Sequence, residues 1–240
     1  MTTSAPHQLS LNVHLSDDAT FDNYFVSPES ANYLALQAVR ALVAPEPAEP
    51  FIYLWGPEGA GISHLLQAAC HQAGLQALHS QYLPLEELAG YAPQQLLDGL
   101  EALDLLCLDG VQHVMGQQGW DHALFHLYNR LRDKPSCRLL VSADCAPRDL
   151  GAALPDLLSR MGWGVVFHLQ PLDDAQKMHA LKQRAKARGI ELADDVISFI
   201  LNRSPRDMNE LFYCLDRLDN LSLSEKRRVT IPFVKETMGW

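Results

Sequence analysis

A glycine-rich segment between an apolar run and a helical pattern is the part of the sequence best suited to chemistry. It reads Gly56-Pro57-Glu58-Gly59-Ala60-Gly61-Ile62-Ser63 and fits the pattern G-x-x-x-x-G-K-[ST] at every fixed position except the lysine, which Ile62 replaces. Small residues let main-chain N–H groups turn toward a phosphate, and the N-terminus of the following helix adds positive potential. The segment predicts a phosphate-binding loop. A glycine-rich turn without a ligand is the alternative.

An aspartate at the end of a buried run supplies the second element of such a site. Leu105-Leu106-Cys107-Leu108 leads directly into Asp109, which could hold magnesium through water, while the hydroxyl of Ser63 would ligate the same ion. Gly110 stands where a hydrolase usually has the glutamate that polarises the attacking water. Because the lysine and this glutamate are both absent, we expect inefficient hydrolysis and binding of a diphosphate as readily as of a triphosphate.

Short apolar runs alternate with helical patterns and must position these groups. After a helix that begins beyond Pro28 and has an apolar pattern at Tyr33, Leu34, Ala38 and Leu42, the runs cover residues 51–55, 78–83, 105–108, 138–142 and 165–169. Each run has the length of a strand buried on both faces, and helical periodicity lies between them, as in Ala123, Leu124, Leu127 and Leu131. The pattern predicts an α/β fold with a five-stranded parallel sheet and crossover helices.

Strand patterns stop after about residue 170, and helical patterns follow. We expect helices over about 173–188, 192–202 and 205–219, and from about 231. Ser204-Pro205-Arg206-Asp207 predicts an N-cap at Ser204, which would place Arg206 and Asn209 on one helical face. The expected organisation is a tail over 1–19, a nucleotide-binding α/β domain over 20–170 and a small helical lid over 171–240.

Composition and charge exclude several classes of protein. The 240 residues are 48% hydrophobic and 20% charged, with no apolar run long enough to span a membrane and no secretory signal pattern, so we expect a cytoplasmic protein. The formal net charge is −10: residues 171–240 contribute +1 and residues 1–170 contribute −11. A contact with DNA is therefore expected to be weak or indirect. Five cysteines without a C-x-x-C pair indicate buried reduced thiols.

Several further stretches, taken in their order and spacing, carry a family resemblance over nearly the whole chain. They are Thr20-Phe21-Asp22-Asn23-Tyr24-Phe25, the loop with its flanks from Tyr53 to Leu65, Leu127-Tyr128-Asn129-Arg130, Leu154-Pro155-Asp156-Leu157, Ser159-Arg160-Met161-Gly162-Trp163-Gly164, and Thr230-Ile231-Pro232-Phe233-Val234-Lys235. The sequence resembles the Hda family, DnaA-related regulatory inactivators of bacterial replication initiation in the AAA+ class. The resemblance implies an ADP-bound adaptor that binds the DNA polymerase sliding clamp and stimulates ATP hydrolysis by DnaA.

The resemblance also implies roles for single residues. Arg160 matches the arginine finger that reaches a nucleotide on a neighbouring DnaA molecule; an ion pair with Asp156 is the alternative. Asp144 matches the first sensor, or caps a helix near Pro147. The second sensor arginine aligns with Asn209, for which Arg206 could substitute. Nucleotide contacts are implied for every residue of the loop from Gly56 to Ser63 and for the next residue, His64. The residues implied along the base, unless they are plain core, are Phe21, Asn23, Tyr24 and Phe25.

The N-terminal run Gln8-Leu9-Ser10-Leu11-Asn12-Val13 resembles a clamp-binding peptide. In such a peptide the glutamine enters a polar niche while the leucines fill an apolar pocket. Asn12 and Val13 depart from the residues that related adaptors often have, which lowers the expected affinity. Two other functions remain open: an independent AAA+ ATPase acting on DNA or protein, and a nucleotide-bound scaffold on the clamp without a finger. Self-association is a further expectation that the sequence leaves open.

Overall fold

The chain divides into two units. The computed structural model describes residues 15–16, 19–28, 30–46, 49–117, 119–133, 136–205 and 207–240, apart from the side chain of Asn209. The first unit comprises residues up to Pro57 together with Gly61–Gln170, and the second comprises Glu58–Ala60 together with Pro171–Trp240.

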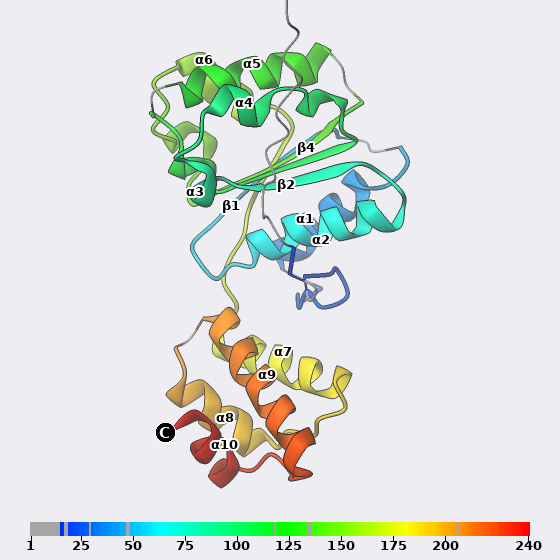
Figure 1. Cartoon of the computed structure of the whole chain (residues 1–240), viewed down its shortest axis with the longest axis vertical. Helices are drawn as coiled ribbons and strands as arrows, with labels where there is room; N and C mark the ends of the chain where they lie inside the picture. Colours follow the sequence, from blue (N-terminus) through cyan, green and yellow to red (C-terminus); the bar gives the residue numbers. More distant parts are fainter. Residues whose placement is uncertain are drawn as a thin grey trace, which may run out of the picture. The chain divides into compact units, whose positions relative to one another are not determined.

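A parallel sheet of five strands forms the centre of the first unit (Figure 1). The strands are β1 Phe51–Trp55, β2 Ser80–Pro84, β3 Leu105–Asp109, β4 Arg138–Ala143 and β5 Val165–His168, in the spatial order β2-β3-β4-β1-β5. Strand β4 pairs with β1 on one side and β3 on the other. The predicted α/β fold with a five-stranded parallel sheet is confirmed. Its strand order places the end of β4 between the phosphate-loop strand and Asp109.

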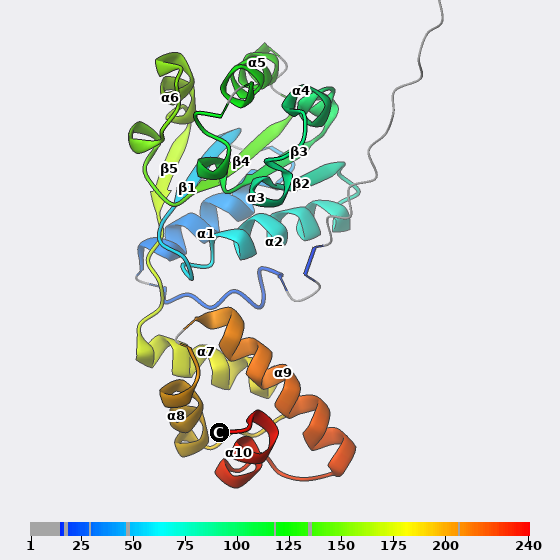
Figure 2. The same cartoon turned by 60° about the vertical axis from the view of Figure 1, so that its left-hand side comes forward.

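Helices cover both faces of this sheet, as connections between parallel strands require (Figure 2). Helices α1 and α2 pack on one face, and α4, α5 and α6 lie over the other. The α-helices of the first unit are α1 Ala31–Leu42, α2 Ile62–Leu75, α3 Leu85–Leu88, α4 Pro93–Leu97, α5 Trp120–Asp133 and α6 Pro155–Met161. Three single 3₁₀ turns complete the described connections: η1 Leu100–Ala102, η2 Val111–His113 and η3 Pro147–Asp149.

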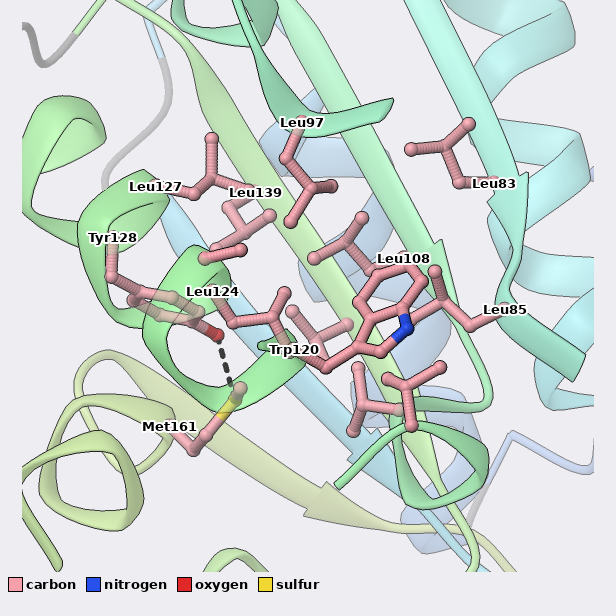
Figure 3. Close-up of a cluster of buried hydrophobic side chains, with 14 of the residues drawn as sticks. Leu83, Leu85, Leu97, Leu108, Trp120, Leu124, Leu127, Tyr128, Leu139 and Met161 are labelled. Atoms are coloured by element: carbon pink, nitrogen blue, oxygen red, sulfur yellow. Dashed lines mark hydrogen bonds between the residues drawn. The ribbon is translucent and has the colours of Figure 1, made fainter. Parts of the chain in front are cut away.

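The core between the sheet and α5 contains large apolar side chains from both layers (Figure 3). Trp120, Leu124 and Leu127 of α5 are buried in one cluster with Leu108 and Leu139 of the sheet. Helix α6 joins the same cluster: the hydroxyl of Tyr128 donates to the Sδ atom of Met161 over 3.0 Å. Burial of these side chains fixes α5 and α6 against each other.

Helix α1 begins and ends with defined polar contacts. The N–H group of Tyr33 donates to the Ser30 hydroxyl at its N-cap. Leu34, placed on the apolar side by the sequence pattern, is 63% exposed, because the buried face runs through Leu36 and Val39 instead. Beyond the helix, the buried guanidinium of Arg138 donates to the carbonyls of Val43 (3.4 Å) and Pro45 (3.3 Å).

The second unit is helical. Its described helices are α7 Asp174–Ala187, α8 Asp194–Arg203, α9 Met208–Glu225 and α10 Ile231–Met238, around a core that includes Leu181, Ile197 and Phe233. The N-cap prediction was wrong. Ser204 is the C-cap of α8, and Asp207 accepts from the N–H group of Glu210 (3.3 Å) at the start of α9. The helix therefore begins three residues later than expected.

Two expectations about the whole chain concern thiols and membranes. All five cysteines are free; Cys145 is half-buried and the other four are buried. Among the described helices, none has the length and apolar content needed to cross a membrane.

Candidate functional site

The glycine-rich loop joins the end of β1 to the start of α2. Gly59 (φ +78°) and Gly61 (φ +80°) both adopt left-handed backbone conformations, which side chains disfavour. Gly61 is the N-cap of α2 and offers no capping side chain, so the first N–H groups of the helix, from Ile62 onward, have no such partner. Main-chain donors at a helix N-terminus form an arrangement suited to binding a phosphate.

An aromatic side chain from the N-terminal segment covers this loop. A Cβ atom at Gly61 would lie 2.9 Å from Cε2 of Tyr24, so glycine is required for this close approach. The Tyr24 ring also lies 5.4 Å from that of His64, whose Nε2 atom is 2.8 Å from the carbonyl oxygen of Thr20. Burial raises the pKa of the Tyr24 hydroxyl well above its ordinary value. The structure thus brings Tyr24 and His64 together beside the loop.

The other residues expected to lie along the base of the nucleotide differ from Tyr24 in their surroundings. Phe21 is buried beneath the guanidinium of Arg40, 5.4 Å from the ring centroid, and its carbonyl accepts from the same side chain. Asn23 is exposed and Phe25 half-buried. Core packing, the alternative left open by the sequence, describes Phe21, whereas Tyr24 lies against the loop glycine Gly61.

One face of α2 holds the backbone that precedes Tyr24. The carboxamide of Gln67 accepts from the N–H group of Ser16 (2.8 Å), and Nε2 of His71 lies 2.9 Å from the carbonyl oxygen of Ser16. With the contact between His64 and Thr20, three side chains spaced three and four residues apart attach this segment to the helix that follows the loop.

Asp109, at the end of β3, accepts hydrogen bonds on both carboxylate oxygens. The hydroxyl of Tyr82, on β2, donates to Oδ2 over 2.5 Å, and the hydroxyl of Ser142, on β4, donates to Oδ1. The N–H group of Gly110 in turn donates to Oγ of Ser142 over 2.7 Å. Burial and the adjacent Asp109 carboxylate raise the pKa of Tyr82, which keeps its hydroxyl protonated as the donor. Asp109 therefore links three neighbouring strands.

These contacts bear on the magnesium ion expected at Ser63 and Asp109. Magnesium in nucleotide sites is held by one or two carboxylates together with phosphates. Here the one carboxylate expected to serve already accepts two short hydrogen bonds. Within the described residues, no group of three or more His, Cys, Asp or Glu side chains is arranged to bind a metal ion. A magnesium ion held by Asp109 through water and by the hydroxyl of Ser63 stays a prediction.

Gly110 lacks a catalytic side chain, and its backbone conformation also favours glycine. Its φ angle is +76°, and an added Cβ atom would lie 2.9 Å from Cδ2 of His113. A glutamate at this position would carry left-handed strain and would require the His113 side chain to move. The position lacks a catalytic carboxylate and is built in a way that disfavours one.

The polar residue of β4 that approaches Asp109 is Ser142 rather than Asp144. Asp144 is exposed beyond the end of the strand, and the N-cap of the following turn is Ala146, without a side-chain hydrogen bond. Capping by Asp144 is therefore wrong, and its sensor role stays a prediction. The sequence analysis singled out neither Ser142 nor Tyr82. The signal that could have found them is a hydroxyl-bearing side chain within a predicted strand, over 138–142 and 78–83.

Arg160 lies on the last turn of α6, away from Asp109 in the chain but in the same unit. Its Nε–H donates to Oδ1 of Asn129 (3.0 Å), and its Nη1 donates to the carbonyl of Asp156 (2.9 Å). The guanidinium carbon lies 4.1 Å from the ring centroid of Phe125 and 5.4 Å from that of Trp163. Asp156 thus contributes its main-chain carbonyl rather than its carboxylate, so the expected ion-pair alternative is wrong.

Two groups of expected site residues lie outside the described residues. The clamp-binding run comprises Gln8, Leu9, Ser10, Leu11 and Val13, and Arg206 is likewise not described. Asn209 falls in the first turn of α9, but its side chain is not described.

Comparison with known protein families finds a match for each of the two units. Residues 15–168 match the bacterial DnaA ATPase domain, and residues 174–238 match the lid domain of Hda. Domain III of the Thermotoga maritima replication initiation protein DnaA has a TM-score of 0.76 and 22% identity, covering 95% of this chain and 98% of that one.

Other solved structures are similar over most of the chain. AMPPCP-bound DnaA from Aquifex aeolicus has a TM-score of 0.71 and 25% identity, covering 87% of this chain and 67% of that one. The Thermotoga maritima RuvB Holliday junction branch migration motor has a TM-score of 0.66 and 18% identity, covering 92% and 71%. The chain belongs to the bacterial DnaA ATPase-domain family, as an Hda/DnaA-like AAA+ protein with an Hda-type lid.

Proposed function

We propose that this DnaA-related regulatory protein is an ADP-bound adaptor that docks on the sliding clamp and stimulates ATP hydrolysis by DnaA through Arg160. The family match supports an interaction with DnaA. Clamp docking is assigned to Gln8–Val13 on the resemblance of that run to clamp-binding peptides.

The observation that carries the proposal is the contrast between a phosphate loop built for binding and a site poorly equipped for hydrolysis. Gly61 opens the N-terminus of α2 to an anion, yet Ile62 supplies no cation for a third phosphate. Gly110 supplies no base, and its geometry disfavours one. These features favour retention of a diphosphate and weigh against an independent ATPase.

Arg160 is suited to act on a nucleotide held by another molecule. A guanidinium that approaches a γ-phosphate in trans stabilises the charge of phosphoryl transfer and can raise the rate by about 10³- to 10⁵-fold. The side chain of Arg160 is held on α6 by aromatic and amide contacts, and within the described part of the chain it forms no ion pair with a carboxylate. Direct binding of the body to DNA is not required, which agrees with its acidic charge.

The test is phosphate release by ATP-bound DnaA with clamp-loaded DNA and this protein. Arg160→Ala should abolish stimulation while leaving ADP binding and clamp binding at wild-type values, and Arg160→Lys should also fail, because a lysine cannot reproduce the planar fork. Arg132→Ala is the matched control, since Arg132 is an exposed arginine that also lies over Trp163. Stimulation that survives Arg160→Ala would favour a clamp-bound scaffold instead.

Nucleotide preference is tested separately by calorimetry. ADP and ATP should bind with similar affinity, and the isolated protein should release little phosphate. Much tighter ATP binding accompanied by rapid turnover would favour the independent ATPase.

A further inference from the structure

Two cysteine thiols from different elements of the first unit face each other inside the core. Sγ of Cys70, on α2, lies 3.5 Å from Sγ of Cys107, on β3, and the two residues are 3% and 0% exposed. The Cys107 thiol also contacts the carbonyl oxygen of Leu66, one turn before Cys70, over 3.6 Å. The packing of α2 on the sheet thus holds the two sulfur atoms in contact (Figure 2).

Each cysteine lies on an element that leads directly to the predicted nucleotide site. Helix α2 begins immediately after the glycine-rich loop, and Cys70 lies about two turns farther along it. Strand β3 ends at Asp109, two residues beyond Cys107. Between them, Gln67 of α2 donates to the Tyr82 hydroxyl over 3.4 Å, and Tyr82 donates to Asp109 over 2.5 Å. A change in the spacing of α2 and β3 would therefore act on both sides of the site.

We propose that Cys70 and Cys107 form a reversible intramolecular disulfide when the protein meets a hydroperoxide, and that this bond weakens nucleotide binding. A disulfide bond is about 2 Å long, so sulfur atoms that already lie 3.5 Å apart need only a small movement to form one. Cys137 and Cys214, by contrast, are directed at oxygen atoms.

The reaction balances with hydrogen peroxide as the two-electron oxidant. The Cys70 sulfur attacks one peroxide oxygen, the O–O bond breaks, one water leaves, and the sulfur becomes a sulfenic acid. The Cys107 sulfur then attacks the Cys70 sulfur, and the sulfenic oxygen leaves as a second water with the proton of the Cys107 thiol. Two thiols are oxidised to one disulfide, and one peroxide is reduced to two waters. Cys70 is assigned the first step because part of its surface reaches solvent.

The bond should act on the nucleotide site through a small displacement. The two sulfur atoms must approach by about 1.5 Å, and a close-packed interior transmits such a shift. Because α2 carries the N–H groups at the loop and β3 carries Asp109, the two sides of the site would change their spacing. We expect ADP to bind about five- to fiftyfold more weakly, which is an ordinary coupling between sites. This effect rests on the proposed nucleotide binding, whereas formation of the bond does not.

The experiment treats the full chain with hydrogen peroxide in a Cys145→Ser background, because Cys145 is the half-buried thiol that could link two molecules. Mass spectrometry without reductant should show a monomer that has lost two hydrogen atoms and, after digestion, two peptides joined through Cys70 and Cys107. Dithiothreitol should restore both hydrogen atoms. Cys70→Ala and Cys107→Ala should each prevent the loss. The matched control is Cys137→Ala, at a buried thiol of the same unit, which should leave the reaction unchanged.

Calorimetry with ADP measures the consequence for binding. The oxidised protein should bind ADP about five- to fiftyfold more weakly than the reduced protein, and dithiothreitol should restore the affinity. Cys107→Ala should bind ADP equally well before and after peroxide. Thermal unfolding of each variant verifies that it is folded, and the comparison of the oxidised with the reduced protein needs no substitution at either cysteine of the pair.

The outcomes separate this inference from the proposed function. If the reduced protein binds no ADP although the disulfide forms, the proposed function fails, and the effect on binding fails with it. If ADP binds but Cys70 proceeds to a sulfinic acid without forming a disulfide, the pairing is overturned and nucleotide binding stands. If the disulfide forms and the affinity for ADP is unchanged, the switch is overturned, because the site then tolerates the altered spacing of α2 and β3.

Discussion

Replacement of Ser142 by alanine should destabilise the first unit far more than an ordinary serine substitution. Ser142 is 3% exposed, and its hydroxyl donates to Asp109 and accepts from the N–H group of Gly110. A hydrogen bond to a charged group contributes about 1.5–3 kcal/mol, and loss of the partner of the half-buried Gly110 N–H group costs toward the lower end of about 1–3 kcal/mol. Because the two losses share one site, we expect a total of about 3–4 kcal/mol in the free energy of unfolding.

Urea denaturation followed by tryptophan fluorescence measures this loss. A Trp240→Phe background leaves Trp55, Trp120 and Trp163, all in the first unit, as the reporters. Ser142→Thr keeps the hydroxyl and should recover most of the stability. Ser136→Ala, at an exposed serine of the same unit, is the control and should change stability by less than about 0.5 kcal/mol.

A loss below about 1 kcal/mol for Ser142→Ala, or a loss equal to that of Ser136→Ala, would refute the reasoning. Asp109 would then not depend on Ser142, and the assignment of its carboxylate to a link between strands would have to be abandoned. A change in the slope of the free energy against urea would instead indicate an altered unfolded or native state.

Three further predictions follow from local geometry. Gly164→Ala should cost about 3–5 kcal/mol in urea denaturation, because its φ is +87° and the new Cβ would lie 2.1 Å from the Phe51 carbonyl oxygen; Gly90→Ala, with open space around it, should cost little. Burial raises the pKa of the Cys137 thiol from 9.0 to about 12, so its contribution to stability is present below pH 9 and lost as the pH rises toward 12; urea midpoints at pH 8 and 10.5 should show this fall, reduced in Cys137→Ala. In calorimetry, ADP affinity should change by less than about tenfold when EDTA replaces magnesium, and a larger loss would mean that the ion is bound despite the hydrogen bonds on Asp109.

The strands and most helices were predictable from the sequence because their apolar runs are short, periodic and separated by turn residues. Asp109 was placed correctly at the end of β3, and a helix, α2, follows the loop as expected. The contacts of Asp109 were not predictable. Tyr82 and Ser142 reach it only because β2 and β4 flank β3, and an alternation of strands and helices does not determine that spatial order.

Local competition explains the errors at helix ends. Ser204 and Asp207 are both good N-cap residues, and sequence alone does not rank them when a proline lies between. In the structure, Ser204 closes the preceding helix. The surroundings of Arg160 were missed for another reason: Phe125 and Asn129 look like ordinary positions of an amphipathic helix until α6 packs beside them.

The buried guanidinium of Arg138 has a consequence for how the first unit responds to its solvent. Its positive charge is stabilised by the carbonyl groups of Val43 and Pro45, just beyond α1. These groups, unlike a carboxylate, do not take up a proton in acid. Because arginine stays charged throughout the accessible pH range, this junction should persist in acid that releases the carboxylate contacts of the surface. The hydrogen bonds of Arg138 therefore hold the chain segment that leads into β1, the strand before the phosphate loop, and acid does not remove them.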